Sequence, residues 1–135
     1  MKNMKRKILK QCLDIALKNN TPLKHPQWTC YHHFSFIIQD NKIIDWGTNR
    51  QSEPLTYLGY GSYSKMHSEV DAFFKAKGIM DKRETFEVIN IRLTNTHLIR
   101  ESAPCKCCFA FLENLGCRKI WFTTKLGKFA SVVLN

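Results

Sequence analysis

The sequence predicts an α/β fold in which helices lie against a mixed β-sheet. Segments with helical periodicity alternate with segments rich in β-branched and aromatic residues, and clusters of turn residues separate them. The composition, with 44% hydrophobic and 24% charged residues, is typical of a folded globular protein and excludes a disordered or fibrous one. The 135 residues fit one domain, and no repeat or linker marks a boundary, so we expect a single domain over residues 1–135.

The first half of the chain is expected to form a helix, a hairpin and a long loop. One face of the segment from about 4 to 19 repeats apolar residues at the period of an amphipathic helix: Ile8, Cys12, Ile15 and Ala16. Strands are expected at 31–39 and 42–47, with a turn at Asp40 and Asn41 between them. Residues 48–65 show neither period, so we expect a long loop of the kind that is often functional.

The second half is expected to contain two helices and three strands. An apolar stripe at helical spacing predicts a helix from about 66 to 77, and the β-branched segment 86–93 predicts a strand. A short extended piece leads to Pro104, after which a helix is expected from about 105 to 115. Two closing strands are expected at 120–123 and 129–134, although the pattern of the second also fits a helix.

The chain is strongly basic, with 21 Lys and Arg against 11 Asp and Glu and a net charge of +10. The first ten residues hold five cations and no acid, and the segment 117–135 again holds only cations: Arg118, Lys119, Lys125 and Lys128. Two basic ends could form one surface for a polyanion such as single-stranded DNA or RNA. Alternatively, the positive charge has no role in binding and reflects an AT-rich coding sequence, which also makes Lys, Asn and Ile abundant.

No apolar run approaches the roughly 18 residues that a membrane span requires. The basic N-terminus lacks the uninterrupted apolar stretch of a signal peptide, because Lys10, Gln11 and Asp14 break it. We therefore expect a cytoplasmic protein with no membrane partner. Cytosolic thiols stay reduced, so the six cysteines are interpreted as ligands or nucleophiles and not as a disulfide framework.

Two short motifs stand at the starts of two expected helices. His67-Ser68-Glu69 opens one, and Pro104-Cys105-Lys106-Cys107-Cys108 opens the other. One imidazole and two thiolates, from His67, Cys105 and Cys108, supply the three ligands of a catalytic Zn²⁺, whose fourth position holds water. Cys105 and Cys108 are three residues apart and share one face of a helix, and the helix N-terminus favours their thiolate forms.

Glu69 lies two residues beyond His67 and is the candidate catalytic acid and base. It could accept a proton from the water that zinc activates, and then deliver protons to the ring nitrogen and to the leaving ammonia. A closed structural zinc site, with Cys107 or another residue as fourth ligand, is the alternative, although neighbouring residues point about 100° apart on a helix. In a second alternative the site binds no metal, and Cys107 is simply a packed or reactive thiol.

These motifs, together with Trp46-Gly47-Thr48-Asn49, resemble the cytidine deaminase superfamily, which also includes tRNA adenosine deaminases and APOBEC editors. The resemblance runs from about 46 to 123 and implies a three-layer α/β fold with a mixed five-stranded sheet flanked by helices. It implies a zinc-dependent hydrolase, and a homo-oligomer is among the assemblies that such proteins form. Asn49 matches an asparagine that contacts the sugar or base, although a turn role is also open. Ala103 stands where Ser or Glu is usual, so the subfamily stays undecided.

The expected reaction is hydrolytic deamination of cytosine to uracil. Single-stranded nucleic acid is slightly favoured as substrate, as in DNA editing, because of the charge and because the loop tyrosines, with Trp28, Tyr31, His32 and His33, could stack on unpaired bases. Packing of these aromatic residues in the core and loops is the open alternative. The first alternative is a free dCMP or cytidine deaminase, and a tRNA adenosine deaminase or a non-catalytic zinc module that binds nucleic acid ranks lower. The residues proposed to bind substrate are Asn49, Trp28, Tyr31, His33, Ala103 and Trp121.

Overall fold

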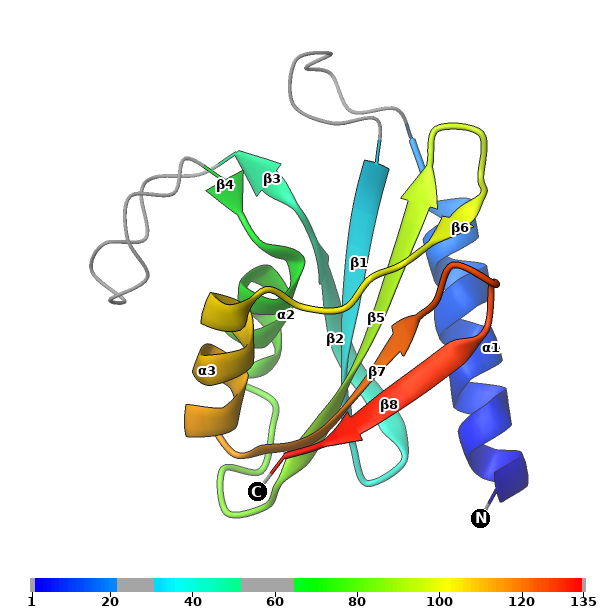
Figure 1. The fold of residues 1–135 in the computed structure, drawn as a ribbon. Helices are drawn as coiled ribbons and strands as arrows, with labels where there is room; N and C mark the ends of the chain where they lie inside the picture. The colour runs from blue at the N-terminus through cyan, green and yellow to red at the C-terminus, as the bar shows by residue number, and fades with distance from the viewer. Residues whose placement is uncertain (1, 22–30, 52–64, 135) are drawn as a thin grey trace.

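A computed structural model describes residues 2–21, 31–51 and 65–134. Within these ranges the chain forms a helical layer on each side of an open, mixed six-stranded sheet (Figure 1). Five strands run in the order β2 (Lys42–Thr48), β1 (Tyr31–Gln39), β5 (Phe86–Thr94), β7 (Cys117–Thr123) and β8 (Phe129–Val133). The sixth, β6 (Ile99–Arg100), pairs with β5 outside this order. The α/β class predicted from the sequence is therefore confirmed.

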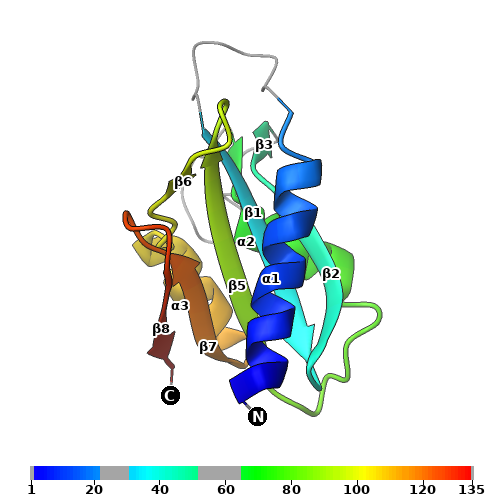
Figure 2. The same ribbon diagram turned by 90° about the vertical axis from the view of Figure 1, so that its right-hand side faces the viewer.

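Helix α1 (Lys2–Lys18) covers one face of the sheet, and helices α2 (Ser68–Ala76) and α3 (Lys106–Asn114) cover the other (Figures 1 and 2). Alternating side chains of β1 show how the strands supply both faces. Phe36 packs in the cluster under α1, whereas Ile37 packs in the cluster under α2 and α3. Each cluster is apolar, and burial of these two sets of side chains is the main favourable term in folding.

Strand β5 is the centre of the sheet, antiparallel to β1 and parallel to β7. Seven of its nine residues are buried, as expected for a strand that is covered on both faces. The closing strands β7 and β8 are antiparallel, so the segment 129–133 is a strand and not the helix that its pattern also allowed. Strand β5 thus carries side chains toward both helical layers.

Two features differ from the sequence prediction. Residues 50, 51 and 65, expected to lie in a long loop, and residue 66, expected to begin a helix, pair as a two-stranded sheet of β3 (Arg50–Gln51) and β4 (Lys65–Met66). The extended piece before Pro104 contributes β6 and makes the sheet six-stranded and not five-stranded. A strand of two residues is too short to show the alternation of polar and apolar side chains from which a strand is recognised. The sequence pattern therefore could not predict these short strands.

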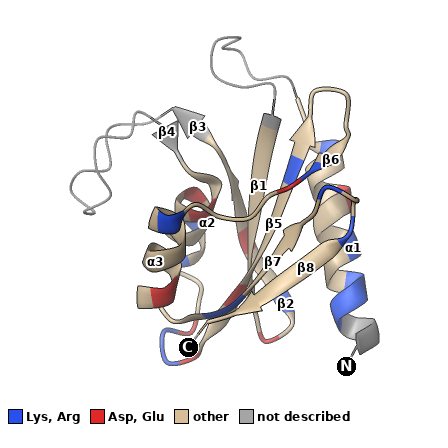
Figure 3. Cartoon of the chain, viewed as in Figure 1, with Lys and Arg blue, Asp and Glu red and all other residues tan. Residues whose placement is uncertain are grey.

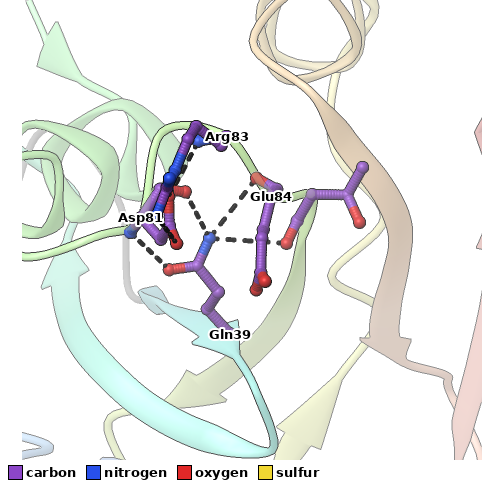
Figure 4. Close-up of polar contacts among 5 residues, drawn as sticks. Gln39, Asp81, Arg83 and Glu84 are labelled. Carbon is purple, nitrogen blue, oxygen red and sulfur yellow. Dashed lines mark hydrogen bonds and ion pairs between the residues drawn. The ribbon is translucent and has the colours of Figure 1, made fainter.

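Gln39, the last residue of β1, ties the connection between α2 and β5 to the sheet (Figure 4). Its side-chain Oε1 accepts a hydrogen bond from the Asp81 backbone N–H at 2.8 Å, and its Nε2 donates to the Asp81 carbonyl, also at 2.8 Å. The same Nε2 lies 3.4 Å from the carbonyl of Glu84. A buried amide thereby satisfies backbone groups that would otherwise lack partners.

No helix in the described parts of the chain combines the length and the apolar character needed to cross a bilayer.

Candidate metal centre and its acid-base residue

The two sequence motifs meet where α2 and α3 begin. His67 is the N-cap residue of α2 and Cys105 is the N-cap residue of α3, and both have extended backbone conformations without a side-chain cap hydrogen bond. Their side chains are therefore available to each other and to Cys108 in the first turn of α3. The imidazole nitrogen and both sulfur atoms lie within 4.8 Å of one another.

The spacing inside the cluster is short. His67 Nδ1 is 3.1 Å from Cys108 Sγ and 3.5 Å from Cys105 Sγ. Cys108 is buried, whereas Cys105 is exposed, so the cluster lies at the edge of the core and is open on one side. Three donors of nitrogen and sulfur type on an open site match the ligand number and chemistry of a catalytic zinc centre.

The electrostatics of the cluster favour a cation. Hydrogen bonds from Cys108 and His67 lower the pKa of Cys105 to about 3, so the first thiolate forms readily. The hydrogen bond with Cys105 and burial raise the pKa of Cys108, and Glu69 raises it further. A second thiolate beside the first one and a carboxylate is costly unless a positive ion is present. The residues present therefore fit a divalent metal with affinity for thiolate and imidazole, which is zinc.

Glu69 is 6% exposed and lies in the first turn of α2. Asn90 Nδ2 donates a hydrogen bond to Glu69 Oε2 at 3.0 Å, and Ser68 Oγ lies 3.3 Å from Glu69 Oε1. Burial raises the pKa of Glu69, against the opposing effects of backbone hydrogen bonding, the neighbouring His67 and the Asn90 amide. A buried carboxyl with a raised pKa beside a metal cluster is the environment of a residue that both accepts and donates protons.

A chain of buried polar side chains supports this carboxyl. Ser35 Oγ donates to Asn90 Oδ1 at 2.6 Å, because the amide oxygen can only accept. The hydroxyl of Ser35 has no second proton, so Ser68 must be the donor in the 2.7 Å contact between the two serine oxygens. The Asn90 amide in turn donates to Glu69 Oε2 and ends the chain. All four residues are buried, and these hydrogen bonds fix the orientation of the Asn90 amide.

Sequence reasoning missed Ser35, Asn90 and Ser102. Ser102 Oγ donates to the Asn90 carbonyl at 2.9 Å and accepts from the Thr123 backbone N–H at 2.7 Å, which positions the segment that leads into α3. The available signal was weak: Asn90 is a polar residue within the apolar segment 86–93. A buried polar side chain in a central strand requires a partner, and that requirement could have flagged it.

A close approach of α2 to β2 fixes the helix that carries His67 and Glu69. Gly47 has no side chain, and a Cβ at that position would lie 2.6 Å from Asp71 Oδ2 and 2.8 Å from the Asp71 carbonyl carbon. The Thr48 backbone N–H donates to the same Asp71 oxygen at 3.0 Å. The Trp-Gly-Thr-Asn motif is thus explained in part by packing, since only glycine allows this separation.

The proposed substrate-binding residues are distributed unevenly. Asn49 follows β2, and its Oδ1 accepts from the His33 backbone N–H at 2.9 Å, so the side chain joins the ends of β1 and β2. Ala103 is exposed in the segment just before Cys105. Trp28 and the side chain of Tyr31 lie outside the described residues.

The structure does not bring Trp121 to the cluster. Trp121 packs in the cluster under α1, on the opposite face of the sheet, and its indole N–H donates to Glu87 Oε1 at 2.8 Å. The ammonium groups of Lys5 and Lys119 lie over its ring at 5.5 Å and 4.3 Å from the centroid. Trp121 is therefore occupied by packing and cation–π contacts away from the candidate site.

Comparisons with solved structures identify the fold. The chain superposes on a cytidine deaminase from Burkholderia pseudomallei with a TM-score of 0.64 and 15% identity, over 94% of this chain and 91% of that one. It also superposes on the dCMP deaminase of cyanophage S-TIM5. For the apo form the TM-score is 0.57 at 15% identity, covering 87% of this chain and 83% of that one. For the complex with dCMP and dUMP the TM-score is 0.55 at 15% identity, covering 89% and 80%.

No protein-family model matches the chain, and no curated protein matches it by sequence. The resemblance inferred from the motifs is thus confirmed at the level of structure, over nearly the whole chain. The chain has the α/β fold of the cytidine and dCMP deaminases. Within that fold, the starts of α2 and α3 bring His67, Cys105 and Cys108 together.

Proposed function

We propose that the protein is a zinc-dependent hydrolytic deaminase that converts cytosine to uracil. The observation that carries this proposal is a buried carboxyl, Glu69, held beside three donors that fit zinc: His67 Nδ1, Cys105 Sγ and Cys108 Sγ. The bound ion would supply Lewis-acid activation of a water molecule. A structural zinc site would have no need of a buried carboxyl at its edge.

Glu69 is proposed to move protons between water and the substrate. Its Oε2 accepts from Asn90 at 3.0 Å, and Oε1, whose contact with Ser68 Oγ is longer at 3.3 Å, is proposed to be the oxygen that exchanges protons with the reactants. Burial raises the pKa of Glu69, which makes the carboxyl a better proton acceptor than an exposed glutamate, as a group with a dual acid and base role requires. Asn90 is a positioning residue, since it acts through Glu69.

The substrate is proposed to be a cytosine nucleotide. The basic helix α1 lies on the opposite face of the sheet from His67, Cys105 and Cys108, so its lysines do not line the candidate site (Figure 3). One of them, Lys5, is paired with Glu87 at 3.0 Å. This placement removes one reason for preferring a strand, so we place the free nucleotide first. A cytosine in single-stranded nucleic acid is the second candidate, supported by the net charge of +10.

The test measures ammonia release and conversion of cytosine to uracil by zinc-loaded protein, with dCMP, cytidine and a cytosine-containing single-stranded oligonucleotide offered separately. We expect turnover of the nucleotide and none by Glu69→Gln. Zinc content and melting temperature of Glu69→Gln should match the wild type, because Gln keeps the shape and removes the titrating group. Silence on all three substrates by zinc-loaded, folded protein would refute the proposal, as would full activity of Glu69→Gln.

A further inference from the structure

A basic pocket of about 370 Å³ lies beside the candidate site, lined by Arg92, Arg100, Glu101 and Lys125. It forms where β7 ends at Thr123 and β6 takes its place along the edge of β5. Figure 3 shows Lys and Arg at β6 and in the turn between β7 and β8, which approach each other here. Three cations and one carboxylate leave an excess of two positive charges in this pocket.

The strand register sets two of these cations directly opposite each other. Arg92 of β5 pairs with Arg100 of β6, and so both side chains stand on the same face of the sheet. Like charges that face each other across a strand pair are destabilising. The arrangement is therefore suited to an anion that the two guanidinium groups can share.

The same register connects the pocket to the candidate site. Asn90, which holds Glu69, and Arg92 are two residues apart on β5 and point to the face that α2 and α3 cover. That step along a strand is about 6.6 Å. Ser102, whose carbonyl accepts from Asn90 at 3.3 Å, directly follows Glu101 of the pocket. A substrate that contacts both the candidate site and the pocket therefore needs to span only the step from Asn90 to Arg92 along β5.

We propose that this pocket binds the phosphate of the substrate, and that it makes the enzyme select a phosphorylated cytosine nucleoside over the free nucleoside. The inference rests on the proposed deaminase function. A phosphate monoester carries about −1.5 to −2 charges at neutral pH, which the excess of two positive charges matches. Arg92 is already oriented, because its Nη1 donates to the Glu101 carbonyl at 3.3 Å, and a guanidinium can bind phosphate with two parallel hydrogen bonds.

The phosphate can come from a free nucleotide or from a strand, and the substrates in the test separate the two. The double variant Arg100→Gln/Lys125→Gln removes two exposed cations of the pocket without removing apolar core. Lys128→Gln is the matched control, because Lys128 is an exposed lysine in the same turn and does not line the pocket. For each protein, kcat/KM is measured with deoxycytidine, with dCMP and with an oligonucleotide that has no terminal phosphate.

We expect the double variant to lower kcat/KM for dCMP by about 100-fold, at about 10-fold for each lost charged hydrogen bond, and to leave deoxycytidine within about 2-fold. The control should match the wild type on every substrate. Loss confined to the oligonucleotide would assign the pocket to a strand phosphate. An equal loss on dCMP and deoxycytidine, or no loss on either phosphorylated substrate, would overturn the proposal.

A second readout separates this proposal from the proposed function. Binding of dUMP is measured by titration calorimetry on the zinc-loaded wild type, the double variant and Lys128→Gln. If no substrate is deaminated but dUMP binds the wild type and not the double variant, the deaminase proposal fails and the phosphate pocket stands. Equal dUMP affinity for the wild type and the double variant overturns the pocket, whatever the activity.

Discussion

Replacement of Gly47 by alanine tests how closely β2 must approach α2 for the site to form. The added Cβ would lie 2.6 Å from Asp71 Oδ2 and closer still to the Ala72 backbone nitrogen, whereas ordinary contact begins at 3.4 Å. The helix would have to withdraw by about 1 Å to bring the Ala72 backbone nitrogen to ordinary contact, because backbone cannot turn aside as a side chain can. His67 and Glu69 lie at the start of the same helix and would move with it.

The cost follows from two terms. Overpacking in a close contact costs about 1–3 kcal/mol. Withdrawal also stretches the 3.0 Å hydrogen bond from the Thr48 N–H to the Asp71 carboxylate, worth about 1.5–3 kcal/mol. We expect Gly47→Ala to lower the free energy of unfolding by about 3 kcal/mol, and the melting temperature by about 12 °C at about 4 °C for each kcal/mol.

The assay combines thermal or urea unfolding with zinc content after dialysis against a dilute chelator. Gly78→Ala is the control, because a Cβ there would meet nothing within 4 Å, and it should be neutral or stabilise by about 0.4–1 kcal/mol. Gly47→Ala should lose zinc at a lower chelator concentration than either the wild type or the control. A Gly47→Ala protein with wild-type stability and zinc affinity would refute the argument that this glycine sets the position of α2.

Three further outcomes are expected. Asn90→Ala should retain zinc but lower kcat by about 10- to 100-fold, measured beside zinc content, because Glu69 Oε2 loses its donor. Cys107→Ser should bind zinc as the wild type does, whereas Cys105→Ser should not, and metal analysis of dialysed protein checks both. Burial alone would raise the pKa of Glu87, but hydrogen bonds from Trp121, Lys5 and Arg118 outweigh it and lower the pKa. The lowered pKa means that the ionised Glu87 carboxylate stabilises the folded state. This contribution is present above the unfolded-state pKa of about 4.3 and is lost as pH falls through the lower folded-state pKa. In urea titrations, Glu87→Gln should therefore be less stable than the wild type at pH 7, and the two proteins should become equally stable in acid.

Much of the fold could be predicted because its longer elements carry clear patterns. The segment 31–39, the turn at Asp40 and Asn41, and the segment 42–48 form a hairpin as expected, and both turn residues have positive φ angles of 53° and 57°. Asn and Asp tolerate that conformation, which is the reason the sequence indicated a turn. The three metal-binding candidates could be named because His67-Ser68-Glu69 and Pro104-Cys105-Lys106-Cys107-Cys108 resemble the motifs of a known family, whereas local spacing links only Cys105 with Cys108.

The surroundings of the site could not be predicted, because they depend on which strands are neighbours. Ser35 and Asn90 are 55 residues apart and meet only because β1 pairs with β5 in a register that sets them opposite each other. The same holds for Arg92 and Arg100, which look like two unrelated surface cations in the sequence. Local pattern gives the elements, whereas tertiary register gives the partners.

Trp121 shows why residue type alone misleads about a site. Its neighbours Ile120 and Phe122 are also apolar, so the segment has no polar alternation from which to tell one face of the strand from the other. The structure turns Ile120 and Phe122 toward α2 and α3, and the pleat then sends Trp121 to the α1 face. A polar residue in a buried strand has the opposite property. Asn90 must find a partner on the face to which it points, and that partner is Glu69. In this chain the uncharged polar residue Asn90 in the central strand is therefore a better guide to the site than the aromatic Trp121 in the neighbouring strand.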